Sequence, residues 1–121
     1  MSAASLHDSV ALAERIAAIA ADKKAIDIRV IDLRGIVSYT DFFVICSGGS
    51  ERQAKAIHDA IYEELKHDEE RLLPRRTEGN RESRWILLDY WDVVAHIFTP
   101  EAREYYRLES LWGEAPVRSV G

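Results

Sequence analysis

The segment Ser47-Gly48-Gly49-Ser50 is the part of this 121-residue chain with the clearest potential for chemistry. It follows an apolar run and precedes a helical pattern, so its backbone N–H groups would lie at the start of a helix. Free N–H groups at such a position can bind a phosphate or another anion. The simpler interpretation is that Ser50 caps the helix, since serine is a preferred N-cap residue. The cap is favoured, because the P-loop and dinucleotide signatures are absent from the chain.

Phosphate chemistry at this turn would also need carboxylates close by. Nucleotidyltransferases follow a Gly-Ser turn with metal-binding carboxylates, and Asp59 falls at nearly the right separation. Ala60 and Ile61 follow it, however, so no second carboxylate is adjacent. Two-metal phosphoryl transfer needs clustered carboxylates to hold the ions. An enzyme that uses the 48–50 turn is therefore the alternative function, and we expect no catalytic residue, no metal site and no cofactor.

The histidines and the cysteine give no sign of a metal or nucleophile site. The four histidines, His7, His58, His67 and His96, lack metal-ligand spacing. His96 lies in an apolar strand pattern, which favours a hydrogen-bonded histidine of the core or of a sheet face. Cys46 is the only cysteine, so an internal disulfide and a Cys-pair zinc site are excluded, and a packed thiol is expected. Neither a signal peptide nor a membrane span is apparent, and we expect a cytoplasmic protein.

The C-terminal third combines aromatic and acidic residues in a way that is typical of a protein-binding surface. The net charge is −5, and residues 85–121 carry 6 acidic and 3 basic groups. This balance argues against a protein that binds bare nucleic acid and suits a basic protein partner. Tyrosine and tryptophan often anchor interfaces, although Tyr105 could instead pack in the core. We assign the docking face to Trp85, Leu87, Asp89, Tyr90, Asp92, Tyr105 and Glu109.

Apolar periodicity and capping signals predict the elements that position these residues. Helical spacing covers residues 5–24 and 51–67, and Thr99-Pro100-Glu101 has the composition of a third helix start. Alternating or wholly apolar runs predict five strands, near residues 26–30, 42–46, 75–78, 85–88 and 93–98. The order is α-β-β-α-β-β-β-α. We expect one α/β domain over residues 1–113, a mixed five-stranded sheet flanked by helices, and a loose tail over 114–121.

Several separated motifs resemble the ribosomal silencing factor family, also called RsfS/Iojap. The resemblance extends over about residues 5–113 and is specific, because the motifs occur in the family's order. The main ones are residues 39–48 (YTDFFVICSG), 85–90 (WILLDY), 96–98 (HIF), 103–106 (REYY) and 108–112 (LESLW).

The resemblance implies a fold and a function as well as a family. It implies a nucleotidyltransferase-like α/β fold without transferase activity. It also implies binding to ribosomal protein L-fourteen of the large subunit, which sterically blocks the small subunit and represses translation under nutrient shortage. A homodimer, a bacterial cytoplasmic location, and no membrane or direct sequence-specific nucleic-acid binding are further expectations.

Trp91 departs from the pattern of the family, which usually has glycine between the tyrosine and aspartate of this hairpin. Glycine suits a turn with positive φ, and another residue there costs roughly 1 kcal/mol. Either the turn differs locally, or Trp91 contributes contact area.

Overall fold

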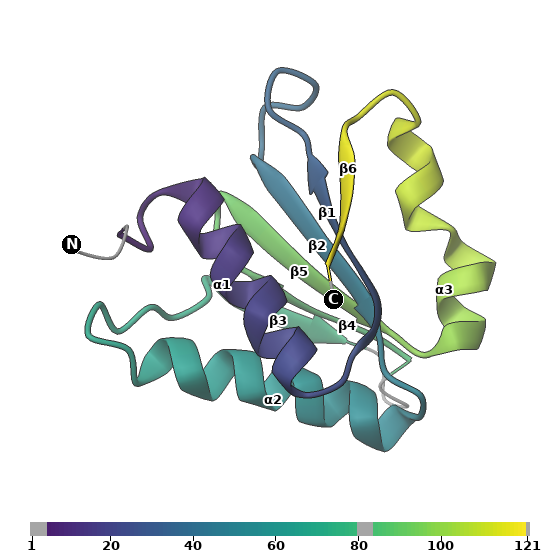
Figure 1. Cartoon of the computed structure of the whole chain (residues 1–121), viewed down its shortest axis with the longest axis horizontal. Coiled ribbons are helices and arrows are strands. Elements are labelled where there is room, and N and C mark those ends of the chain that lie inside the picture. The colour runs from purple at the N-terminus through teal and green to yellow at the C-terminus, as the bar shows by residue number, and fades with distance from the viewer. Residues whose placement is uncertain (1–4, 80–83, 121) are drawn as a thin grey trace.

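A mixed sheet with helices on both faces is the framework of the protein (Figure 1). The computed structural model describes residues 5–79 and 84–120. The six strands of the sheet follow the order β3-β4-β5-β2-β1-β6. Their bounds are β1 Ile26–Asp32, β2 Phe42–Ser47, β3 Arg76–Gly79, β4 Trp85–Asp89, β5 Val93–Phe98 and β6 Val117–Val120. The helices are α1 Ser9–Asp22, α2 Glu51–Lys66 and α3 Pro100–Tyr106, followed by the 3-10 turn η1 Leu108–Trp112.

The two central strands explain why their sequences are apolar on both sides. β2 and β5 run parallel, and all six residues of each strand are buried. One face of the sheet packs on α1 and α2, and the other packs on α3 and η1 (Figure 1). A strand covered on both faces has no polar side to present, which explains the wholly apolar run at 42–46.

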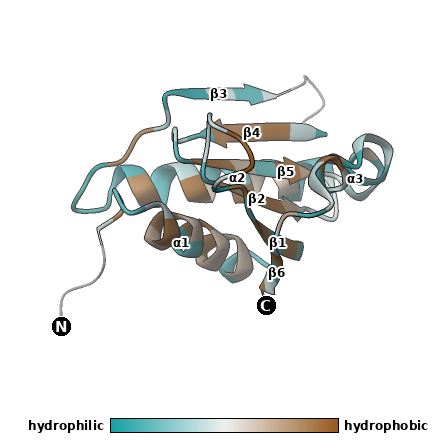
Figure 2. Cartoon of the chain, turned by 90° about the horizontal axis from the view of Figure 1, so that it is seen from above, coloured by the Kyte–Doolittle hydropathy of each residue, from teal (hydrophilic) through white to brown (hydrophobic). Residues whose placement is uncertain are grey.

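The face that carries α3 is covered unevenly. Ile31, Phe43 and Phe98 from three strands pack under Ala102 of α3 and Leu108 of η1. On β4, towards the edge of the sheet, Trp85 and Leu87 on this face are only half-buried. The edge strand β3 is hydrophilic next to a largely hydrophobic β4 (Figure 2). The α3 side therefore leaves apolar surface over β4 available for contact.

Helix caps fix where the helices begin. Ser50 accepts a hydrogen bond from the backbone N–H of Gln53 at 3.1 Å, and Thr99 accepts one from Ala102 at 3.4 Å. The first helix begins at Ser9 rather than near residue 5, because the Asp8 carboxylate accepts from the N–H of Val10. The prediction of a helix over 5–24 is thus too long at its N-terminal end, whereas the later two starts are confirmed.

Replacing Ser50 with alanine should lower the free energy of unfolding by about 1 kcal/mol, because the Gln53 N–H loses its acceptor at an exposed cap. Urea unfolding of the purified protein measures the loss. Ser50→Asp is the matched control, since aspartate caps equally well and should retain stability. Equal stability of the alanine variant and the parent protein would contradict the capping role.

The strand count differs from the prediction, because part of the expected tail joins the sheet. Val117–Val120 forms β6 and pairs antiparallel with β1, with Ile31 opposite Val117 and Ile28 opposite Val120. Arg118 also pairs with Glu14 of α1. The sheet has six strands rather than five, and residues 117–120 are not a loose tail. The physical reason is that the outer edge of β1 carries unpaired N–H and C=O groups, which β6 satisfies.

Candidate docking face

Trp85 is the centre of an aromatic cluster on the half-covered face of the sheet. Its ring lies 5.1 Å from that of Phe98 and 4.7 Å from that of Tyr106, measured between centroids. Its indole Nε1 donates a hydrogen bond to Nδ1 of His96 at 3.1 Å. Leu87 points to the same side, because alternate residues of a strand share a face. Trp85 and Leu87 are both half-buried, as a contact surface requires.

His96, in the neighbouring strand β5, contacts Trp85 through this hydrogen bond and a ring contact. It is 5% exposed, and its ring lies 4.5 Å from the ring of Phe43. Burial lowers the pKa of His96 from 6.5 to about 3, against a smaller opposing effect of the Asp89 charge. The ring is therefore neutral at pH 7, and since Nδ1 accepts the indole hydrogen bond, Nε2 carries the proton. Within the described residues that Nε2–H has no acceptor. The expected hydrogen-bonded sheet histidine is confirmed.

Tyr105 lies on the surface rather than in the core. It is 80% exposed, and its ring meets that of Tyr106 edge-on at 5.0 Å. Tyr106 is 47% exposed and links Tyr105 to Trp85. The three rings form a continuous aromatic stripe from α3 to β4. The alternative that Tyr105 packs in the core is therefore wrong, and Tyr106 joins the surface although the sequence analysis did not assign it there.

Asp89 and Tyr90, which were assigned to the docking face, do not reach that surface. Asp89 is 1% exposed, and its Oδ2 accepts from Nε of Arg75 at 3.0 Å and of Arg76 at 3.2 Å. Tyr90 is 3% exposed and packs in the core beneath α1 and α2, where burial raises the pKa of its hydroxyl. The physical reasons are a long-range ion pair for Asp89 and strand alternation for Tyr90. Asp92, by contrast, is exposed in the β4–β5 turn.

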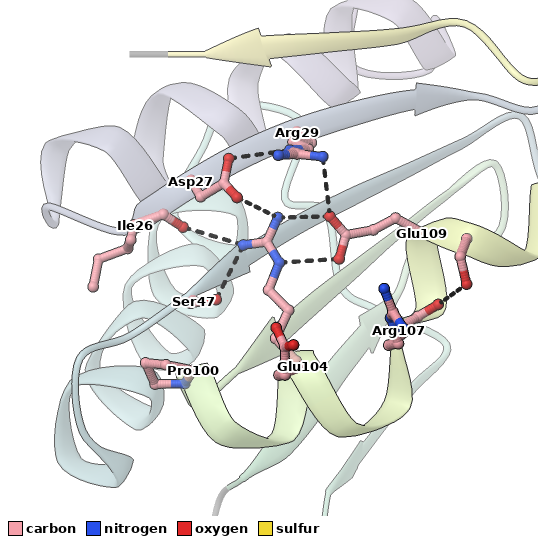
Figure 3. A pocket seen from close by; sticks show the side chains of 10 residues that line it. Ile26, Asp27, Arg29, Ser47, Pro100, Glu104, Arg107 and Glu109 are labelled. Atoms are coloured by element: carbon pink, nitrogen blue, oxygen red, sulfur yellow. Dashed lines mark hydrogen bonds and ion pairs between the residues drawn. The ribbon is translucent and has the colours of Figure 1, made fainter. Parts of the chain in front are cut away.

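Glu109 is half-buried and is held by Arg103. The guanidinium of Arg103 donates to both carboxylate oxygens of Glu109, from Nε at 3.1 Å and from Nη2 at 3.0 Å. Nη1 donates to the backbone oxygen of Ile26 at 3.3 Å and to Ser47 Oγ at 3.0 Å (Figure 3). Glu109 therefore joins η1 and α3 to the sheet, and it does not form an acidic rim.

Charged side chains of opposite sign line the hollow around Arg103. Asp27 lies 3.4 Å from Nη2 of Arg103, and Arg29 lies 3.6 Å from Glu109 (Figure 3). Two guanidinium groups thus face two carboxylates from β1, α3 and η1. An Arg–carboxylate fork satisfies both partners, so the cluster fixes the α3 segment that carries Tyr105. No periodic pattern in the sequence indicated this network, because Arg103 and Glu109 are six residues apart in two different elements and their other partners lie on distant strands.

The turn at residues 47–50 serves packing and capping. A Cβ atom on Gly48 would lie 2.7 Å from Cα of Ala54, so glycine is needed for the close approach of the turn to α2. Asp59 lies about nine residues along α2, which is roughly 13 Å from the cap, and it pairs with Lys55. Residues 5–79 and 84–120 contain no group of three His, Cys, Asp or Glu side chains that could hold a metal.

Cys46 is buried at the end of β2, near the turn. Burial raises the pKa of its thiol to about 12, so the group stays protonated at neutral pH. A protonated, inaccessible thiol is a poor nucleophile, and the prediction of a packed thiol is confirmed.

The comparison with protein families decides the relationship. The family described as "Ribosomal silencing factor during starvation" matches residues 6–121. The chain belongs to the ribosomal silencing factor family. A ribosomal silencing factor RsfS of Bacillus subtilis is 44% identical over 107 residues, which cover 88% of this chain and 89% of that protein. The chloroplastic protein Iojap of Zea mays is 36% identical, over 89% of this chain but only 46% of its own length.

Solved structures have the same architecture as this ribosomal silencing factor domain. A crystal structure from Chromobacterium violaceum matches with a TM-score of 0.77 and 30% identity, over 98% of this chain and 95% of that one. One from Bacillus halodurans gives 0.76 and 36%, over 90% and 97%. Among the described residues, no helix combines the length and apolar character needed to cross a membrane.

Proposed function

We propose that this chain represses translation by binding the large ribosomal subunit and blocking the small subunit from joining it. The partner is ribosomal protein L-fourteen, and the repression acts in the cytoplasm under nutrient shortage. Membership of the ribosomal silencing factor family supports a role on the ribosome. The observation that carries the proposal is the exposed aromatic stripe. The docking face of this chain consists of Trp85, Leu87, Tyr105 and Tyr106. Asp92 lies beyond β4, in the β4–β5 turn.

The chemistry of this face suits a basic protein surface. Trp85 and the two tyrosines offer large rings at low entropic cost, since each ring has few rotatable bonds. The net charge of −5 and the exposed Asp92 favour encounter with a positively charged partner. A steric block needs only a rigid body held in place, and the Arg103 network keeps α3 rigid. A second copy of the chain that used the same face in a homodimer would compete with the ribosome.

Subunit joining tests the function directly. Purified small and large subunits are mixed at joining conditions, with and without an excess of the protein, and separated on a sucrose gradient. We expect the joined ribosomes to decrease and the protein to sediment with the large subunit. An unchanged peak of joined ribosomes, with the protein in excess over subunits, would overturn the proposal.

Truncating Tyr105 to alanine should weaken large-subunit binding by about 2 kcal/mol or more, chiefly through faster dissociation. Its 80% exposure means that folding stability should hardly change. Val10→Ala is the control, since Val10 is 40% exposed on α1, which covers the opposite face of the sheet. Surface-immobilised large subunits give both rates, and thermal melting gives stability. Normal binding by Tyr105→Ala would contradict the proposal that this face binds the large subunit.

A further inference from the structure

Trp91 adopts a backbone conformation that its side chain disfavours. Its φ is +71°, in the left-handed region where a Cβ atom is crowded. The turn is tight, because the N–H of Asp92 donates to the oxygen of Tyr90 at 2.9 Å, and the N–H of Tyr90 donates to Val93 at 2.9 Å. Glycine would adopt this conformation without strain. A tryptophan here therefore opposes the local stability of the turn.

The surrounding structure enforces the conformation. Oδ1 of the buried Asp89 accepts from the N–H of Trp91 at 2.9 Å. The other carboxylate oxygen is held by Arg75 and Arg76. Strained residues persist where neighbouring contacts over-determine them, and they concentrate at functional sites. The result is an indole presented outwards from a fixed turn.

The side chain of Trp91 is not required by the core. It is 51% exposed, and the Arg75 guanidinium lies 5.7 Å from its ring centre. That arginine also pairs with Asp89, so its charge is locally matched. Next to the indole, Asp92 is exposed, and within residues 5–79 and 84–120 its carboxylate has no ion pair. Arg75 covers part of the ring, and half of the Trp91 side chain is still exposed next in sequence to the exposed Asp92. An exposed aromatic ring and a carboxylate in one turn both attract cationic side chains.

The position of this turn continues the docking face. Trp85, Leu87 and Asp89 point to one side of β4, and Arg75 connects Asp89 to Trp91. From Trp85 to Asp89 the strand rises roughly 13 Å, so the 91–92 turn lies at about that distance from Trp85 along β4, with the half-buried Leu87 between them. Continuity and charge both point to the partner that contacts Tyr105.

We propose that Trp91 and Asp92 form a receptor for an arginine or lysine side chain of the large-subunit protein. The cation lies against the exposed face of the indole and beside the Asp92 carboxylate. This inference rests on the proposed function, because it takes the ribosomal partner as the occupant. It explains why a strained tryptophan occupies the turn.

The test uses Trp91→Gly, which should raise the stability of the protein and lower its affinity for the large subunit. Relief of the positive φ should raise the melting temperature by about 4 °C. Loss of the indole should weaken binding to purified large subunits about tenfold, measured with fluorescently labelled protein. Trp91→Asn is the second variant, since asparagine tolerates this conformation without supplying an aromatic face, and it should lose binding to the same extent. Asp92→Asn should reduce the salt dependence of association.

Two results would contradict the proposal that Trp91 and Asp92 bind a cationic side chain. One is unchanged affinity of Trp91→Gly and Trp91→Asn, and the other is a melting temperature that does not rise in Trp91→Gly. Tyr105→Ala is measured in parallel to separate the two proposals. Loss of binding in Tyr105→Ala alone rejects only the receptor, whereas normal binding by every variant rejects the docking face itself.

Discussion

Lowering the pH from 7 to 5 should reduce the free energy of unfolding by about 2 kcal/mol through His96 alone. Burial among Phe43, Trp85 and Phe98 holds the pKa of this histidine near 3 in the folded protein, against 6.5 for the free side chain. Between those values the unfolded chain binds a proton that the folded chain does not. Stability therefore decreases as the pH falls through this window, and it is retained above pH 6.5.

The measurement is a series of urea unfolding curves at pH 7, 6 and 5 for the parent protein and for His96→Gln. Glutamine can still accept the Trp85 N–H hydrogen bond but does not titrate. The variant should be less stable at pH 7, yet its stability should decrease less between pH 7 and 5. The difference between the two slopes isolates the histidine from the carboxylates. Parallel slopes would contradict a buried neutral imidazole.

Replacing Arg103 with methionine should destabilise the protein by about 2–3 kcal/mol. The guanidinium is 9% exposed and holds Glu109, Ser47 and the backbone of Ile26 together. Methionine fills much of the same space but leaves the Glu109 carboxylate without its fork. The half-buried carboxylate then keeps only the longer contact with Arg29, at 3.6 Å, and the carbonyl of Ile26 and the hydroxyl of Ser47 also lose their hydrogen-bond donor.

A double-mutant cycle shows how much of the stability lost in Arg103→Met arises from the Glu109 carboxylate that remains. Arg103→Met combined with Glu109→Leu should recover part of the lost stability, because neither charge then remains. Arg107→Met is the matched control, since Arg107 is exposed one turn further along and lies outside the fork. Chemical unfolding of the four proteins supplies the free energies. A loss below 1 kcal/mol in Arg103→Met would show that the network adds little.

The parts of the fold that sequence reasoning predicted are those with strong local signals. β2 has five consecutive apolar residues, and α2 begins at a serine cap and carries apolar residues at helical spacing. β6 has no such signal, since it is four residues long and mostly exposed. It forms because β1, distant in the sequence, offers an edge to pair with.

Sequence reasoning likewise placed only some residues of the candidate face at the surface, because local patterns do not show long-range partners. Trp85, Leu87 and Tyr105 were placed on one surface from alternation and aromatic type, and these positions agree with the structure. Asp89 and Glu109 were assigned to the docking face although both are held by arginines, because the type of an acidic residue gives no sign of its partner. Their partners, Arg75 and Arg103, are brought to them by tertiary packing.

The charged strand β3 has a consequence for how copies of this chain can meet. The strand is hydrophilic along its length (Figure 2). All four of its residues are exposed, and Arg76 pairs with Glu78 at 2.7 Å. Charges on an outer strand oppose edge-to-edge hydrogen bonding with a neighbouring sheet, the first step of fibrillar aggregation. Continuation of the sheet beyond β3 is therefore an unfavourable way for copies of this chain to pair.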